Sequence, residues 1–159
     1  MHTRPERDQL PASTRPRLTL GRITDALQRH GYSFVPDDEH ENSVRARFDS
    51  YPFTFMVTGE HDSLLLIRGR WDTMPGADQK LDCVRVCNHW NMERMWPKVY
   101  VRRENDEALG VYGETVMDFR FGVDDAELDH TITTALSTII TFFHNVEEEI
   151  SEGDGPATR

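Results

Sequence analysis

Two cysteines and a histidine come closest to a metal site in this sequence. Cys83 and Cys87 lie four positions apart in a segment with helical patterning, and His89 falls roughly 120° around that helix from Cys83. Structural zinc needs three or four converging ligands, usually with closer paired-cysteine spacings. A disulfide across one helical turn would close almost no loop and add little stability. We therefore predict two reduced thiols that act as small packing residues, and no metal.

Two other segments match metal-binding motifs only in part. Residues 144–147 fit the start of an inverted zinc-protease motif, but Glu148 stands where its second histidine belongs. The acidic stretch from Asp37 has Asn42 and Phe48 at the positions where an EF-hand calcium loop needs glycine and glutamate. Glycine-rich phosphate loops and a Gly-x-Ser-x-Gly nucleophile motif are also missing from the sequence. We expect no catalytic residues, no metal and no cofactor.

Aromatic and basic residues gather between positions 88 and 100. The segment reads Asn-His-Trp-Asn-Met-Glu-Arg-Met-Trp-Pro-Lys-Val-Tyr. Such side chains often seal a core at a helix–strand junction, and that alternative stays open. Tryptophan, tyrosine and arginine also dominate binding hot spots, because they bury a large area with few rotatable bonds. On that basis we predict a partner-binding surface of six residues: Trp71, Trp90, Asn91, Trp96, Lys98 and Tyr100.

Helical and strand periodicities alternate along the chain. Residues 32–71 show four short runs with period-two alternation, residues 77–95 form a helix, and two further strands follow within residues 99–121. The connections between strands are short, which favours antiparallel pairing. We predict an α+β fold, with a single antiparallel sheet and N-terminal, middle and C-terminal helices in the order α-β-β-β-β-α-β-β-α.

Polar residues mark the ends of the first and last helices. Thr19 is a suitable N-terminal cap and Gly31 a C-terminal stop for the first helix. Asp124, with Glu127 three residues later, opens the last helix as a capping box would. Helical and strand periodicity then predict a core that contains Leu27, Phe53, Phe55, Leu66, Leu136, Ile139 and Phe143.

Charge and composition divide the chain into three parts. The 159 residues carry a formal net charge of −10, but residues 1–17 hold four arginines against two acidic side chains. We predict a disordered N-terminal arm over residues 1–17, one domain over 18–150, and a disordered acidic tail over 151–159. Nucleic acids and anionic membranes bind to positively charged protein surfaces, and the domain has a negative net charge. We therefore expect neither as a partner.

Targeting signals are missing from the sequence as well. No window approaches the length of apolar residues that spans a bilayer. The first residues lack the apolar region of a secretory signal peptide. These observations favour a cytoplasmic protein.

The pattern Asn-x-Trp-Asn followed by Lys-x-Tyr, at Asn88, Trp90, Asn91, Lys98 and Tyr100, resembles the YbjN family. The resemblance extends over about residues 18–146. The Arg-Gly-Arg-Trp and Trp-Pro-Lys forms are similar to the actinobacterial branch of that family. Further matching pieces follow in the same order along the chain: Phe53-Thr54-Phe55, Ile67-Arg68-Gly69-Arg70-Trp71, Gly113-Glu114, Asp118, Gly122-Val123 and Phe142-Phe143.

The resemblance implies a fold and a general role. Members of the family resemble type III secretion chaperones in fold and are described as sensory transduction regulators. The fold resemblance implies a homodimer that binds a protein or peptide. It implies no secretion system and no particular partner.

The middle helix has apolar residues on two sides. Leu81, Val84, Met92 and Met95 fall on one side of the helical wheel, together with Asn88. A helix that is apolar on two sides is buried from two directions, and a second subunit would supply the additional cover. We predict a dimer interface on the opposite side, formed by Cys83, Val86, Cys87 and Trp90, with Trp90 as anchor. The competing arrangement is that the final helix covers this interface side within one chain.

Two functions are compatible with these residues. The first is a non-enzymatic, dimeric protein- or peptide-binding module, either chaperone-like or regulatory. The alternative is a small-ligand sensor or an enzyme with a pocket against the sheet. The alternative requires polar groups with shifted pKa values in one cleft, such as Glu114, Asp118 and a histidine around a single cavity.

Overall fold

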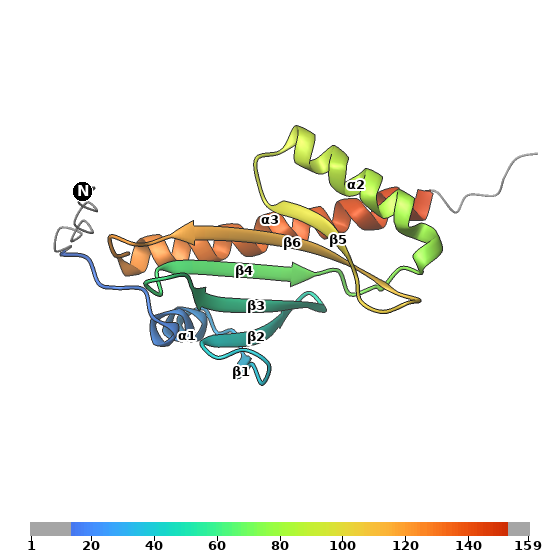
Figure 1. Ribbon diagram of the computed structural model, residues 1–159. Helices are drawn as coiled ribbons and strands as arrows, with labels where there is room; N and C mark the ends of the chain where they lie inside the picture. Colours follow the sequence, from blue (N-terminus) through green and yellow to red (C-terminus); the bar gives the residue numbers. More distant parts are fainter. Residues whose placement is uncertain (1–13, 153–159) are drawn as a thin grey trace, which may run out of the picture.

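The computed structural model describes residues 14–152 and has one six-stranded antiparallel sheet with three α-helices (Figure 1). The strands are ordered β1-β2-β3-β4-β6-β5. The predicted fold class and element order are confirmed. The elements are α1 (Leu20–Arg29), β1 (Phe34–Pro36), β2 (Ser43–Phe48), β3 (Tyr51–Thr58), β4 (Leu64–Arg70), a 3₁₀ turn (Ala77–Gln79), α2 (Lys80–Glu93), β5 (Lys98–Arg103), β6 (Leu109–Asp118) and α3 (Asp125–Glu152).

The predicted helix caps are present. The Thr19 hydroxyl accepts a hydrogen bond from the backbone N–H of Arg22 at 3.2 Å, at the start of α1. Gly31 follows that helix with a φ of 73°, a left-handed conformation that favours glycine. The Asp124 carboxylate accepts from the backbone N–H of Glu127 at 2.8 Å, at the start of α3. The two N-terminal caps each satisfy a backbone N–H that lacks an intrahelical partner, and at the C-terminus of α1 the backbone N–H of Gly31 donates to the oxygen of Gln28 at 2.9 Å.

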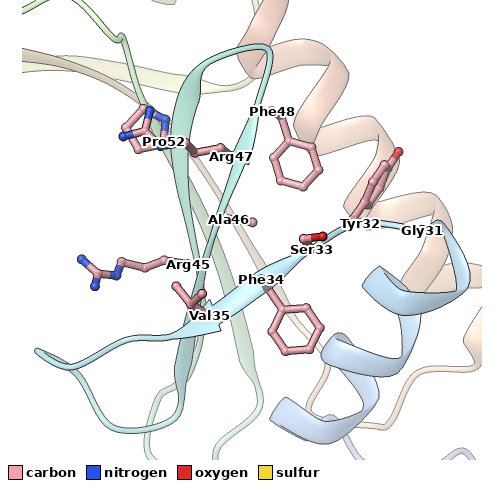
Figure 2. Close-up of a pocket in the computed structure, with 10 residues that line it drawn as sticks. All are labelled: Gly31, Tyr32, Ser33, Phe34, Val35, Arg45, Ala46, Arg47, Phe48 and Pro52. Carbon is pink, nitrogen blue, oxygen red and sulfur yellow. The ribbon is translucent and has the colours of Figure 1, made fainter.

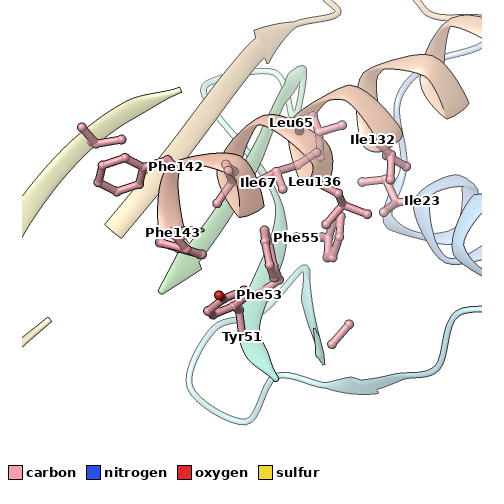
Figure 3. Close-up of a cluster of buried hydrophobic side chains, with 14 of the residues drawn as sticks. Ile23, Tyr51, Phe53, Phe55, Leu65, Ile67, Ile132, Leu136, Phe142 and Phe143 are labelled. Carbon is pink, nitrogen blue, oxygen red and sulfur yellow. The ribbon is translucent and has the colours of Figure 1, made fainter. Parts of the chain in front are cut away.

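All three helices lie on one side of the sheet. The long helix α3 crosses β4 and β6, α1 packs near β3, and α2 lies beside β5 and against α3 (Figure 1). The Phe53 ring on the sheet lies 6.4 Å from the Phe143 ring of α3, and Phe55 lies beside Leu136 of the same helix (Figure 3). All four residues are buried. The core therefore forms between the sheet and α3.

One predicted core residue points the other way. Leu65 and Ile67 are the buried members of β4, whereas Leu66 is half-buried on the opposite face. The prediction for Leu66 was wrong because residues 64–67 are apolar at every position, so alternation does not indicate which face is inside. The other six predicted core residues, Leu27, Phe53, Phe55, Leu136, Ile139 and Phe143, are buried.

The segment before α1 is held against the domain. Arg22 donates from its guanidinium to the backbone oxygens of Pro16 at 3.1 Å and Arg17 at 2.9 Å, and the backbone N–H of Val123 donates to Pro16 at 2.9 Å. Residues 14–17, which we predicted to belong to a disordered arm, therefore join the loop before α3. The rest of the predicted arm, and residues 153–159 of the predicted tail, lie outside the described residues.

Within residues 14–152, no helix is both long enough and apolar enough to cross a bilayer.

Candidate functional site

The inner side of α2 is covered within one chain. Cys83, Val86, Cys87 and Trp90 are all buried, and the Trp90 ring lies 5.2 Å from that of Phe142 in α3. The side that we predicted as a dimer interface is thus the side that packs on α3, as in the competing arrangement. The 28 residues of α3 make it long enough to reach past the sheet and contact α2.

The opposite side of α2 is exposed. Met95, just after the helix, is 90% accessible. Exposed apolar residues of this size on one helix side are a feature of interaction surfaces. We call this the outer surface of α2; its members are Leu81, Val84, Met92 and Met95, with Trp96 beside them.

The two cysteine thiols are buried and free of disulfide bonds. Burial raises the pKa of the Cys87 thiol to about 12, and the neighbouring Cys83 adds to the shift. Burial also raises the pKa of Cys83. These pKa values keep both groups protonated at neutral pH, whereas metal ligation and nucleophilic attack require the thiolate. Among the described residues, no group of three or more histidine, cysteine or acidic side chains converges as metal ligands would.

Trp71 and Asn91 have structural roles. Trp71 is buried, and its indole N–H donates to the Glu147 carboxylate at 3.2 Å. Asn91 holds the start of β5: its amide donates to the backbone oxygen of Val99 at 2.9 Å, and its side-chain oxygen accepts from the backbone N–H of Val99 at 3.2 Å. Both residues therefore hold the fold together at points where we predicted partner contacts.

Trp96 is exposed beside a groove between α2 and α3. Its side chain is 56% accessible, and the groove has a volume of about 310 Å³. The Arg94 guanidinium lies 4.9 Å from the centre of the Trp90 ring, within the range of a cation–π contact. The groove is lined by Trp90, Glu93, Arg94, Met95, Trp96, Thr138 and Thr141.

Lys98 and Tyr100 belong to a network on the other side of the sheet. Both contact Glu114 of β6, a carboxylate that is only 6% accessible. The Lys98 ammonium lies 2.8 Å from Glu114, the Tyr100 hydroxyl donates to it at 3.0 Å, and Arg68 of β4 donates from Nε at 2.7 Å. We call these four residues the Glu114 network. Its members lie far apart in the sequence, and each falls in a segment that resembles the YbjN family.

The network holds Glu114 ionised. Burial alone would raise the pKa of its carboxyl, but hydrogen bonds from Lys98, Arg68 and Tyr100 outweigh burial and lower the pKa below its usual value. Burial and the adjacent Glu114 raise the pKa of the Tyr100 hydroxyl to about 12. A general acid or base works best with a pKa near the operating pH, and these shifts move both groups away from it.

The groups expected for an enzyme do not converge here. Asp118 is four residues from Glu114 on β6 and accepts a hydrogen bond from Ser63 at 3.1 Å. It therefore takes part in a separate contact near the end of the strand. The small-ligand or enzyme alternative is not supported by this geometry.

A second cluster adjoins the Glu114 network. The rings of Tyr100 and Tyr112 stack at 5.4 Å, with 11° between their planes. Arg102 donates to the Tyr112 hydroxyl at 2.8 Å and lies 4.6 Å from the centre of its ring. The same hydroxyl donates to the Glu104 carboxylate. We did not predict this cluster from the sequence. Its signal was the even spacing of residues 98, 100 and 102, which places three polar side chains on one face of β5.

Strand register aligns these residues into rows across the sheet. One row joins Arg45, Thr54, Arg68, Glu114 and Lys98, each directly opposite the next on the neighbouring strand. A parallel row, two residues away along the strands, joins Ser43, Met56, Leu66 and Val116. Within residues 14–152, no helix crosses this side of the sheet, which we call the open face (Figure 1).

A pocket of about 660 Å³ lies at the edge of the sheet around β1 and β2. Figure 2 shows Arg45 and Arg47 on one side of β2, with Tyr32, Phe34 and Phe48 on the side that faces the helices. The residues that line the pocket include no carboxylate, histidine or cysteine. They offer cations and aromatic rings for binding, but no group that would transfer a proton at neutral pH.

Comparison with known proteins identifies the family. Residues 19–148 match the model of the YbjN family, described as "putative bacterial sensory transduction regulator". The chain belongs to the YbjN family. The match spans α1, the whole sheet, α2 and most of α3. No curated protein matches the chain.

Solved structures support the same fold. The crystal structure of YbjN from E. coli is similar with a TM-score of 0.67 and 12% sequence identity, over 85% of this chain and 94% of that one. An uncharacterized protein from Methanothermobacter thermautotrophicus is similar with a TM-score of 0.54 and 12% identity, over 82% of this chain and 98% of that one. At this level of identity the similarity concerns the YbjN fold alone.

Proposed function

We propose that this YbjN-family chain is a non-enzymatic module that binds a protein or peptide partner, in a regulatory or chaperone-like role in the cytoplasm. The observation that carries the proposal is the open face of the sheet. Apolar Met56, Leu66 and Val116 are accessible there beside the Glu114 network. Antiparallel sheets often have one solvated face, but that face is normally polar, so an apolar row on it favours an interaction surface.

The geometry of the polar groups also supports binding over catalysis. Lys98 and Arg68 neutralise Glu114, and two cations lie over the rings of Tyr100 and Tyr112. Such pairs fix side-chain positions and present flat aromatic and cationic groups, which are common at interfaces. Of the six residues first predicted, Trp96, Lys98 and Tyr100 remain candidates for partner contact.

We further propose that the chain is a homodimer, with the outer surface of α2 as the interface. Leu81 and Met92 expose apolar side chains there, and a second copy of the same surface would cover them about a two-fold axis. The Arg-Gly-Arg-Trp and Trp-Pro-Lys segments lead us to place the chain in the actinobacterial branch.

Sedimentation velocity at micromolar concentration tests the dimer. The wild type should sediment as a dimer, and Met92→Glu should sediment as a monomer with an unchanged thermal melt. Trp90→Glu is unsuitable, because Trp90 is in the core and the variant would unfold. Lys80→Glu is the control, since it changes an exposed charge on the same helix. A monomeric wild type would reject the dimer.

Co-purification from the native host tests the binding role. Tagged wild type should retain one or more proteins that a Lys98→Glu, Val116→Glu variant loses, as identified by mass spectrometry. Lys80→Glu should retain the same proteins, and thermal melts must show that both variants are folded. If the open-face variant retains every protein that the wild type retains, the open face is not the binding surface.

A further inference from the structure

We propose that the open face binds an acidic amphipathic helix of a protein partner, lying across the strands. This inference rests on the proposed binding role and specifies the chemistry of the partner. It comes from the charge of the open face, which is opposite to that of the molecule. The whole chain has a net charge of −10, yet the strand positions that point to this side carry a set of six cations: Arg45, Arg47, Arg68, Arg70, Lys98 and Arg102.

Acidic side chains offset most of these cations. Glu114 neutralises part of the charge of Arg68 and Lys98, and Glu104 pairs with Arg102 at 3.4 Å. At the end of β2, Asp37 and Asp38 approach Arg45 at 3.7 and 3.9 Å. Asp118, opposite Leu64 at the end of β6, also belongs to this side. Six cations therefore face five carboxylates, and the remaining positive charge attracts an acidic partner.

Two of the arginines are available to a carboxylate. Arg70 donates to the sulfur of Met74 at 3.5 Å, and sulfur is a weak acceptor. Arg47 donates to the backbone oxygen of Ser50 at 2.8 Å. Within residues 14–152 neither guanidinium forms an ion pair within 4 Å, although the Glu104 carboxylate is near enough to Arg70 for the two charges to attract. A carboxylate from another molecule would form the shorter, charge-assisted bonds that arginine favours.

The two rows define the shape of the partner. The apolar row that contains Met56, Leu66 and Val116 runs beside the row that contains Arg68, about 7 Å away at two residues along a strand. A ligand on both rows needs apolar groups along one line and acidic groups along a parallel line. One side of an amphipathic helix provides this arrangement, with Leu-type residues at helical spacing and Glu on the flank.

The length of the rows sets the length of the helix. The row that contains Arg68 crosses five strands, which at about 4.8 Å spacing gives roughly 19 Å, or about 13 helical residues. The apolar residues of the other row span the three central strands, roughly 10 Å. Val116, which is 47% accessible and lies directly opposite Leu66, makes the apolar row reachable at its β6 end. A phosphate backbone has no group to cover that row, which disfavours nucleic acid.

Fluorescence anisotropy with three labelled 14-residue peptides tests the proposal on the full chain. The first peptide is a helix with four leucines on one side and glutamates beside them; the second has lysine in place of each glutamate; the third has the composition of the first in a non-amphipathic order. The first should bind, and the other two should bind at least roughly tenfold more weakly. Its affinity should fall as salt rises.

Variants locate the site. Arg47→Glu, Arg70→Glu should weaken binding of the first peptide at least roughly tenfold, because like charges would oppose its glutamates. Val116→Thr, which keeps the shape and strand preference, should weaken it several-fold, whereas Arg85→Glu on α2 should leave it unchanged. The proposal would be overturned if the lysine peptide bound as tightly as the first peptide, or if a single-stranded oligonucleotide bound more tightly. It would also be overturned if two copies of the chain associated through the open face and thereby blocked the peptide. If co-purification finds a partner that depends on the open face but no acidic peptide binds, the binding role stands and this inference fails.

Discussion

Replacing Glu114 by glutamine should destabilise the protein by about 1–2 kcal/mol at neutral pH. The glutamine side chain keeps one oxygen, which can accept from Arg68 and Tyr100. Its NH₂ group would replace the oxygen that faces the Lys98 ammonium, so two donors would oppose each other there. A hydrogen bond to a charged group contributes roughly 1.5–3 kcal/mol. In the variant Arg68 keeps its charge but faces a neutral oxygen, so its bond should move to the lower end of that range and lose about 1 kcal/mol. The Lys98 side chain is 64% accessible, so its contact adds less than about 1 kcal/mol.

The pH dependence separates loss of the charge from loss of packing. The pKa of Glu114 is lowered in the folded protein, so its stabilising contribution is present above the unfolded-state pKa of about 4.3 and is lost as pH falls through the folded pKa. The difference between wild type and Glu114→Gln should therefore be constant near neutral pH and shrink in acid.

Urea unfolding from pH 7 down to pH 3 measures this difference. At neutral pH the melting temperature should also fall by about 2–8 °C. Glu148→Gln, an exposed change on α3, is the control and should stay within about 0.5 kcal/mol. Equal stability of wild type and Glu114→Gln at pH 7, or a deficit of the same size at pH 3, would refute the argument that Glu114 acts through its charge.

Three further outcomes follow from the packing. Phe143→Ala should lose about 3–5 kcal/mol in urea unfolding because it empties the space between α3 and the sheet, and an unchanged midpoint would show that α3 packs elsewhere. Asn91→Ala should lose about 1–3 kcal/mol and speed hydrogen exchange at the Val99 amide; unchanged exchange there would count against the role of Asn91 at the start of β5. Cys83 and Cys87 should react with a thiol reagent at pH 8 only after unfolding, because burial raises the pKa of both thiols; rapid labelling of the native protein would contradict this.

Much of the fold was predictable because each local signal had one interpretation. Thr19 and Asp124 cap helices where the sequence places them, and the spacing of Phe53 and Phe55 on either side of Thr54 indicated the correct face of β3. In the run that contains Leu66 both faces are apolar, so the alternation of apolar and polar residues does not indicate which face is buried. Pairing with β3 and β6 decides the orientation of that strand, and pairing is not a local property.

The site was harder to predict for a similar reason. We predicted Trp90 and Trp71 as contact residues from their residue type. In the structure, Trp90 packs against Phe142 of α3, and Trp71 donates a hydrogen bond to Glu147 of α3. Neither contact can be predicted from sequence spacing. Lys98 and Tyr100 were chosen by the same rule and do reach the surface, next to Arg68 and Glu114. Their convergence depends on strand order, in which β6 lies between β4 and β5.

The position of α3 at the end of the fold has a consequence for synthesis on the ribosome. Its 28 residues are the last described element, and they cover the apolar side of strands made long before, such as the β3 strand that carries Phe53. At roughly 5–20 residues per second, α3 takes about 1–6 s to translate. During those seconds the nascent sheet has no helix over much of its apolar side. Nascent chains stalled near residue 124 should therefore depend on ribosome-bound chaperones, and release at that point should yield an insoluble fragment.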